Sequence, residues 1–298
     1  MRIVAKNISC TIENCVEYHT LEMEIMMKKI VQNMFLWLVL LFLYAPIMIL
    51  IVYSFTDSTM IGAIRGFSLK NYITLFTTPE LVEMIFGTFL LAFVVAVLST
   101  LLGTLGAIGA FYSKKKVRNG IELANQIPVV NADVVTGFSI CILMIAFFSI
   151  RKETYIPLLI GQTSLCTPFV YLSVLPRLKQ MDQQLFEAAL DLGCTSTQAL
   201  LKVTIPQIIP GIISGFMTAV TLSLDDYFIT TYTKPATFDT ISTYVVNATK
   251  GAQTDIKTAL WALSTMIFVL VAVVVIGMNV TGKKEKNNVD SDIDGSNL

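Results

Sequence analysis

Six long apolar runs constrain this 298-residue chain more than any other feature of its sequence. Each run is near or above the ~20 residues that a helix rising ~1.5 Å per residue needs to cross ~30 Å of hydrocarbon. The runs cover approximately residues 35–54, 84–112, 121–150, 155–176, 207–232 and 258–280. This pattern predicts an all-α integral membrane protein with six transmembrane helices.

Composition agrees with a protein that lives in a bilayer. Apolar residues make up 54% of the chain and charged residues 14%, and the mean hydropathy is +0.70. So few charges do not provide the polar surface that a soluble domain needs around its core. The formal net charge is zero, which gives no indication of a nucleic-acid partner. We therefore expect membrane lipid, and no nucleic acid, around this chain.

Basic residues between the runs predict which ends lie in the cytoplasm, because lysine and arginine gather on the inner side of membranes. They stand before the first run and after the second, fourth and sixth: Lys28, Lys29, Lys114, Lys115, Lys116, Arg118, Arg177, Lys179, Lys283, Lys284 and Lys286. Arg151 and Lys152 oppose this trend, but Glu153 lies beside them. Both termini and the loop after the fourth run are thus expected inside the cell.

The first 26 residues show no sustained apolar period. We expect a tail without regular structure, or a translation start that really lies at Met26 or Met27, where a short basic segment meets the first apolar run. The apolar run is too long for a cleaved signal peptide, and no small-residue cleavage site follows it.

The loop between the fourth and fifth runs is amphipathic and rich in alanine. Residues 186–192 follow a helical pattern, with Leu190 on the apolar side and Asp191 on the polar side. Gly193 is expected to end this helix, because a residue without a Cβ readily adopts the left-handed conformation that closes one. Thr195 is then expected as the N-cap of a second helix, which Pro206 should stop.

The spacing in this loop resembles the EAA loop of ABC-importer permeases. Glu187-Ala188-Ala189 is followed by three residues, Gly193, nine residues and the sequence VTIP at 203–206. The family pattern has isoleucine and leucine where this chain has Val203 and Ile205. In that family the loop forms a short cytoplasmic helix that sits in a cleft on the ATP-hydrolysing subunit. The resemblance implies coupling to an ATPase through Glu187, Ala188, Ala189, Gly193, Ile205 and Pro206.

The resemblance also implies a domain organisation and a fold. It indicates a type I importer permease with the MetI-like fold, whose core occupies residues 84–280 and contains the coupling loop at 186–207. A cytoplasmic tail at 1–33 and a segment at 34–83, holding the first transmembrane helix and an external stretch, precede the core. A cytoplasmic tail at 281–298 follows it.

The chain lacks the motifs of an enzyme. No G-x-x-x-x-G-K-[ST] occurs, so we expect no ATP site here and ATP with its Mg²⁺ on partner subunits. The lone His19 and the five scattered cysteines form neither a metal-ligand spacing nor a nucleophile with its base. We expect a transport subunit without catalytic residues, cofactor or metal. An ion-coupled secondary transporter is an alternative, but it leaves the EAA spacing unexplained.

Acidic residues within the apolar runs are the candidates for a substrate path. Asp133 lies in the third run, and Asp225 and Asp226 lie in the fifth, followed by Tyr227. A carboxylate at a helix centre costs on the order of 2.5 to 3.5 kcal/mol, so it normally faces a water-filled path or a partner charge. A cationic solute is one such partner. Two interpretations stay open. Either these groups line a path, or Asp225 and Asp226 face external water and Asp133 caps a helix broken at Pro128.

Together, the pattern FLYAPIxILIxYSF at residues 42–55, the segment from Pro128 to Asp133, the EAA loop and LSLDD at 222–226 resemble the spermidine/putrescine importer permeases of the PotC type. The resemblance extends over roughly residues 27–280. It implies polyamine uptake together with a sister permease, two ATP-binding subunits and an extracellular or periplasmic binding protein. It also implies a bacterial inner or plasma membrane. Permeases for other small solutes share much of the pattern and remain an alternative.

Small residues gather on one face within two of the runs. They stand at Gly103, Gly106 and Ala107 in the second run and at Gly211 and Gly215 in the fifth. Such residues let neighbouring helices approach closely, so we expect them to pack helices together and to hold no phosphate.

Overall fold

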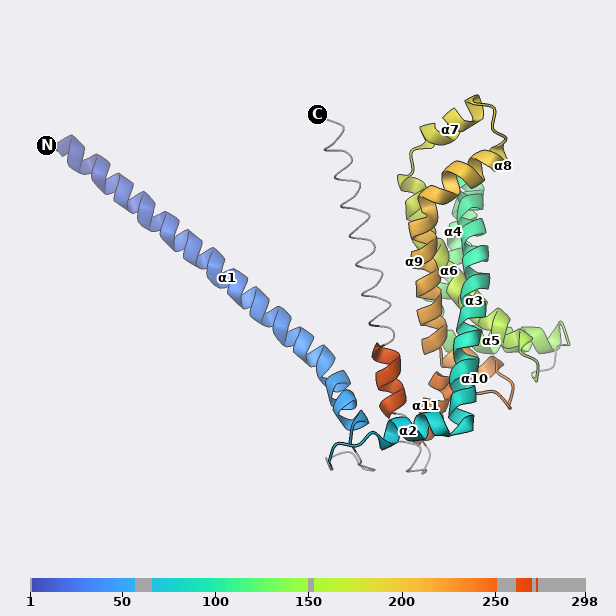
Figure 1. The fold of residues 1–298 in the computed structure, drawn as a ribbon. Helices are drawn as coiled ribbons and strands as arrows, with labels where there is room; N and C mark the ends of the chain where they lie inside the picture. Colours follow the sequence, from blue (N-terminus) through green and yellow to red (C-terminus); the bar gives the residue numbers. More distant parts are fainter. Residues whose placement is uncertain (1, 57–65, 150–152, 251–260, 270–271, 273–298) are drawn as a thin grey trace. The chain divides into compact units, whose positions relative to one another are not determined.

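The computed structural model describes residues 2–56, 66–149, 153–250, 261–269 and 272. These residues are almost entirely helical, and their only β pairing is an isolated bridge between Thr56 and Phe67 (Figure 1). Four of the described helices are long and apolar enough to cross a membrane, or five if a bent pair forms one span. The prediction of an all-α membrane protein is confirmed. Most of the sixth run, 258–280, lies outside the described residues.

The chain divides into two compact units, which are described separately. One comprises residues 1–72 and 261–280, and the other comprises residues 73–260 and 281–298. Helix α1 of the first unit runs from Arg2 to Ser54 without interruption. The structure therefore has helix where the sequence predicts an irregular tail. The physical reason is that no glycine or proline precedes Pro46, so nothing breaks the helix.

The apolar part of α1 has little cover within its own unit. The span Met26–Ser54 is the most apolar of the candidate spans, and none of its most apolar window is buried. A helix this apolar needs lipid or other apolar surface around it. Its end is held by the segment that follows: the Asn71 side chain donates to the carbonyls of Ser54 and Thr56, each at 3.1 Å. Asn71 belongs to α2 (Lys70–Thr77).

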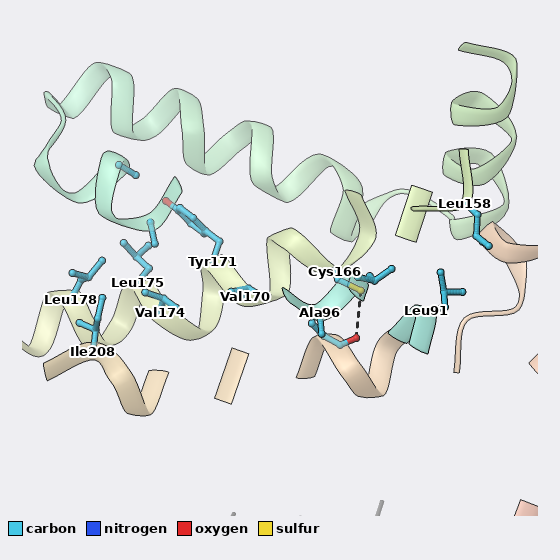
Figure 2. Close-up of a cluster of buried hydrophobic side chains, with 14 residues drawn as sticks. Leu91, Ala96, Leu158, Cys166, Val170, Tyr171, Val174, Leu175, Leu178 and Ile208 are labelled. Atoms are coloured by element: carbon cyan, nitrogen blue, oxygen red, sulfur yellow. Dashed lines mark hydrogen bonds between the residues drawn. The ribbon is translucent and has the colours of Figure 1, made fainter. Parts of the chain in front are cut away.

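Three long helices form the core of the second unit: α3 (Pro79–Tyr112), α6 (Ile156–Gln180) and α9 (Ile205–Asp225). Figure 2 shows the apolar side chains that meet between them, with Val170 and Val174 fully buried on α6. The Cys166 thiol also donates to the carbonyl of Ala219 on α9, at 3.6 Å. Burial on this scale makes the three helices one rigid frame.

Small residues set the spacing of this frame, as the sequence predicts. A Cβ added at Gly103 on α3 would lie 2.7 Å from the Val170 Cβ, and one at Gly215 on α9 would lie 3.1 Å from the Val170 Cγ1. Val170 is thus enclosed between two glycines on neighbouring helices. Helix contacts this close need residues without side chains.

The third apolar run is not one straight span. It forms α4 (Lys115–Val130) and α5 (Asp133–Ala146), which meet at 107°. Asn131 and Ala132 adopt extended backbone conformations between them, and the Asn131 amide donates to the Thr136 hydroxyl at 3.0 Å. The run at 121–150 is therefore broken, as the interpretation with a helix broken at Pro128 predicts. Pro128 weakens the end of α4 because it lacks the N–H that a helix needs.

Candidate functional site

The EAA residues lie in a coupling segment, residues 183–206, at the end of the second unit where α6 finishes and α9 begins (Figure 1). Its first helix, α7, spans Gln183–Asp191. The Asp182 carboxylate caps this helix by accepting the Gln184 N–H at 2.9 Å. The helix therefore starts before Glu187. It is short and amphipathic, like a surface element that docks through one face.

Gly193 closes α7 in the way the sequence predicts. Its φ is +88°, in the left-handed region that favours glycine. The Gly193 N–H donates to the Leu190 carbonyl at 2.9 Å, and the Cys194 N–H donates to the Ala189 carbonyl at 3.1 Å. This pair of bonds is the Schellman motif, which satisfies the last carbonyls of a helix. A Cβ at Gly193 would meet nothing within 4 Å, so only the backbone conformation demands glycine.

In the second half of the coupling segment, the predicted start of the helix is confirmed and the predicted end is wrong. Thr195 caps α8 (Ser196–Ala199) in a capping box with Gln198, as predicted from Thr195. Pro206, however, does not stop the helix. Residues Leu200–Thr204 form a π-helical turn that leads directly into α9. Pro206 lies in the first turn of α9, where a missing N–H costs least.

Part of the coupling segment is exposed, and part is anchored to the core. Glu187, Ala188 and Pro206 are exposed, Ile205 is half-buried and Ala189 is buried. Leu192, beside the glycine turn, is 87% exposed. Leu185 and Leu201 of the same segment are also exposed, and several exposed apolar side chains on one short segment are typical of a surface that another protein covers.

Tyr112, the last residue of α3, anchors the coupling segment, a role that no sequence motif indicates. Its ring lies 5.3 Å from that of Phe186 on α7, and its hydroxyl lies 3.4 Å from the Thr204 hydroxyl in the π turn. Thr204 is fully buried. An aromatic residue at the end of an apolar run, just before a basic cluster, was the only available signal.

The fifth apolar run breaks at the acidic pair. Helix α9 ends at Asp225, and α10 (Phe228–Thr233) starts after Tyr227. The Asp226 carboxylate is 8% exposed and accepts the N–H groups of Ile229 and Thr230, at 3.2 and 2.8 Å, and the Thr230 hydroxyl at 2.6 Å. Asp226 thus satisfies the free N–H groups at the start of α10.

A buried glutamine connects this break to α6. The Gln162 amide donates to the Thr230 hydroxyl at 2.7 Å and to Asp226 at 3.4 Å, and its oxygen accepts the Ser223 hydroxyl at 2.6 Å. We call Gln162, Ser223, Asp226 and Thr230 the buried joint. It ties α6, α9 and α10 with side chains that are all buried. Sequence reasoning missed Gln162, although a glutamine inside an apolar run was a usable signal.

The other path candidates have different surroundings. Asp225 is exposed, so the two neighbouring carboxylates face opposite environments. Tyr227 is half-buried, with its ring 5.2 Å from that of Phe228. Asp133 is exposed in the first turn of α5, which packs on α10. The structure brings Asp225 and Tyr227 together at the break and puts Asp133 on the helix alongside. Among the described residues, no three His, Cys, Asp or Glu side chains gather as metal ligands.

The long helices, the broken span and the coupling segment define a membrane transport subunit. This chain belongs to the family "Binding-protein-dependent transport system inner membrane component", whose pattern matches residues 99–284. It is a multi-pass membrane permease of that class.

Relatives of known name cover most of the chain. The putrescine transport system permease protein PotI of Escherichia coli K12 is 29% identical over 239 residues, which are 78% of this chain and 84% of PotI. The spermidine/putrescine transport system permease protein PotC of Haemophilus influenzae is 28% identical over 254 residues, which are 85% of this chain and 96% of PotC.

Solved structures agree with the fold predicted by the resemblance. A bacterial ABC transporter that imports the acidic polysaccharide alginate contains a chain with a TM-score of 0.69 and 18% identity, covering 90% of this chain and 98% of that one. The MetNI methionine ABC transporter contains one with a TM-score of 0.53 and 15% identity, covering 68% and 93%. At these identities the likeness shows the fold alone, which is that of type I ABC-importer permeases.

Proposed function

We propose that this chain is one of two permease subunits of an ATP-driven importer of polyamines such as putrescine and spermidine. The observation that carries the proposal is the similarity, over 78% and 85% of the chain, to permeases named for putrescine and spermidine transport. Each ammonium group of a polyamine needs a carboxylate or a similar acceptor, and the methylenes between them need an apolar or aromatic wall.

The proposed partners follow from what the chain lacks and what it exposes. Its sequence has no P-loop, so ATP and Mg²⁺ are proposed to bind to two ATPase subunits. A sister permease forms the second half of the path, and an extracellular or periplasmic binding protein delivers the solute. In this proposal the chain itself holds no cofactor and performs no hydrolysis.

The coupling segment is the proposed contact with an ATPase subunit. Leu192 offers an apolar anchor, and exposed Glu187 offers a charge on the same short segment. The anchor at Tyr112 would transmit a push on α7 to α3, and the π turn would transmit it to α9. Closure of the ATPase pair can thereby move two of the three core helices together.

The proposed path runs past the break between α9 and α10. Asp225 has the exposed carboxylate that a cation needs, and Tyr227 adds an aromatic face. Asp133 supplies a further exposed carboxylate on α5. The oxygens of Asp226 already accept hydrogen bonds from Ile229 and Thr230. Asp226 therefore supports the path indirectly, by holding the buried joint together.

We further propose that the coupling segment and both termini face the cytoplasm of a bacterial cell, as the basic residues predict. Single cysteines at Thr197 and Ala236, both exposed, test this orientation in a variant without the native cysteines. An impermeant maleimide should label Ala236→Cys in intact cells and Thr197→Cys only after the membrane is opened. Labelling of Thr197→Cys in intact cells would reverse the assignment.

Uptake by the purified complex tests the function itself. The chain, a sister permease, the ATPase subunits and the binding protein are reconstituted in liposomes, and entry of radiolabelled putrescine and spermidine is measured. We expect uptake that needs both ATP and the binding protein, and that falls at least severalfold in Asp225→Asn. Uptake driven by an ion gradient without ATP would support a secondary transporter. ATP-dependent uptake of a different solute would replace the polyamine.

A further inference from the structure

A pocket lies in the second unit, at the end opposite the coupling segment, where α3 and α6 begin. This outer pocket has a volume of about 690 Å³ and is lined by α3, the start of α6, residues 237–239 and α11 (Ile241–Lys250). Pockets that hold small molecules are typically about 300 to 1,000 Å³. The outer pocket shares no residue with the acidic break after α9.

The walls of the outer pocket combine four aromatic side chains with aliphatic ones. The rings of Tyr155 and Phe238 meet edge to face at 5.4 Å, and Phe238 also lies over Gly87, where an added Cβ would be 2.9 Å from the ring. Phe86 and Tyr244 complete this lining. Aromatic faces attract cations and also cover methylene groups.

Two carboxylates at the pocket have no cationic partner among the described residues. Glu80 and Glu83 lie one turn apart on α3 and are both exposed, and the ion pairs of the described chain do not include them. Asp239, the third acid of the lining, is paired with Lys234 at 2.7 Å. Burial, and then the carboxylates of Glu80 and Asp239, raise the pKa of Tyr244, so this phenol stays neutral at physiological pH. The pocket therefore has an excess of two negative charges.

We infer that the outer pocket binds a short aliphatic chain with an ammonium group at each end, as a loading site before the path at Asp225. This inference rests on the proposed function and adds a second place where the solute is held. The two unpaired carboxylates of the pocket match the two charges of a diamine, and its aromatic wall matches the carbon chain between them. A solute that loses one positive charge loses one of the two matching interactions.

Protection of a single cysteine from labelling tests the site directly. Thr237 lines the outer pocket and is exposed, whereas its neighbour Ala236 is exposed and does not line it. In a complex without native cysteines, putrescine should slow maleimide labelling of Thr237→Cys and leave labelling of Ala236→Cys unchanged. Butylamine, which carries one charge, should give the same protection only at a roughly tenfold higher concentration. Butane-1,4-diol, which carries none, should give no protection.

Removal of the carboxylates provides the decisive comparison. Glu80→Gln/Glu83→Gln should shift putrescine protection of Thr237→Cys to at least tenfold higher concentration. Glu153→Gln is the matched control, since it removes an exposed acid close to the start of α6 that is not part of the pocket lining. Absence of protection by putrescine, or protection that persists in the double variant, would overturn the inference.

The same variants separate this inference from the proposed function. Polyamine uptake by a complex in which putrescine does not protect Thr237→Cys would leave the function standing and remove the loading site. Protection without any polyamine uptake would remove the proposed function instead. If the double variant weakened only the binding of the loaded binding protein, the pocket would be a docking surface for that protein, and the inference would be wrong.

Discussion

The coupling segment and the buried joint are both short interruptions of long helices, yet they are built in opposite ways. The coupling segment is held by local bonds between residues close in sequence, such as the Schellman motif at Gly193 and the capping box at Thr195. In the buried joint, by contrast, Gln162 bonds to Ser223, Asp226 and Thr230, which are all more than 60 positions away. One can move as a surface element, whereas the other fixes the frame around the path.

The largest effect should come from the carboxylate of the buried joint. Asp226→Ala leaves the N–H groups of Ile229 and Thr230 and the hydroxyl of Thr230 without their acceptor, each in a buried position. Each buried polar group without a partner costs about 1 to 3 kcal/mol, so we expect the free energy of unfolding to fall by about 3 kcal/mol or more. Thermal unfolding of the purified complex measures it. Asp225→Ala, at an exposed carboxylate, should change stability by less than about 0.5 kcal/mol. Equal melting temperatures for the two variants would contradict the buried joint.

Gln162 should show the next largest effect. Gln162→Leu keeps most of the side-chain volume but leaves the Ser223 hydroxyl without its acceptor and removes a donor to Thr230. We expect a loss of about 1 to 3 kcal/mol, read from the same unfolding experiment. Gln184→Leu, at an exposed position of α7, is the matched control and should unfold like the unchanged protein. A destabilised control with a stable Gln162→Leu would reverse the contrast between the two regions.

The glycine of the coupling segment should affect communication rather than folding. At φ +88° a β-branched residue is strained by about 1 to 2 kcal/mol, whereas asparagine tolerates this conformation better. Gly193→Val should therefore strongly reduce ATP hydrolysis stimulated by the loaded binding protein, and Gly193→Asn should reduce it less. Both should lower the unfolding temperature less than Asp226→Ala does, because the turn is exposed and nothing packs on Gly193. Normal stimulation in Gly193→Val would mean that the turn takes no part in coupling.

The smallest effect is expected from the capping box. Thr195→Ala removes the hydroxyl that accepts the Gln198 N–H, which typically costs about 1 kcal/mol of local helix stability. Stimulated ATP hydrolysis should fall by less than about tenfold, because tenfold corresponds to about 1.4 kcal/mol. Thr197→Ala is the matched control. The Thr197 hydroxyl takes no part in the capping box, so this variant should behave like the unchanged protein. A larger loss in Thr197→Ala would show that its hydroxyl contacts the partner directly.

Sequence alone determined the features that depend on local chemistry. Length and hydropathy predicted the apolar helices, and spacing predicted the glycine turn at Gly193 and the N-cap at Thr195. These features form between residues a few positions apart, so their signals stand next to one another in the chain.

Tertiary structure decided the features that depend on distant residues. The sequence placed Asp225 and Asp226 side by side as candidates for one path, but packing buried one and exposed the other. It predicted a stop at Pro206, whereas the π turn carries the chain past that proline. It left open whether the run over 121–150 is broken, and the structure bends that span by 107°. Gln162 and Glu83 gain their roles only from the helices packed beside them. The physical reason is that burial and pairing are properties of neighbours in space, which a single chain read in order does not reveal.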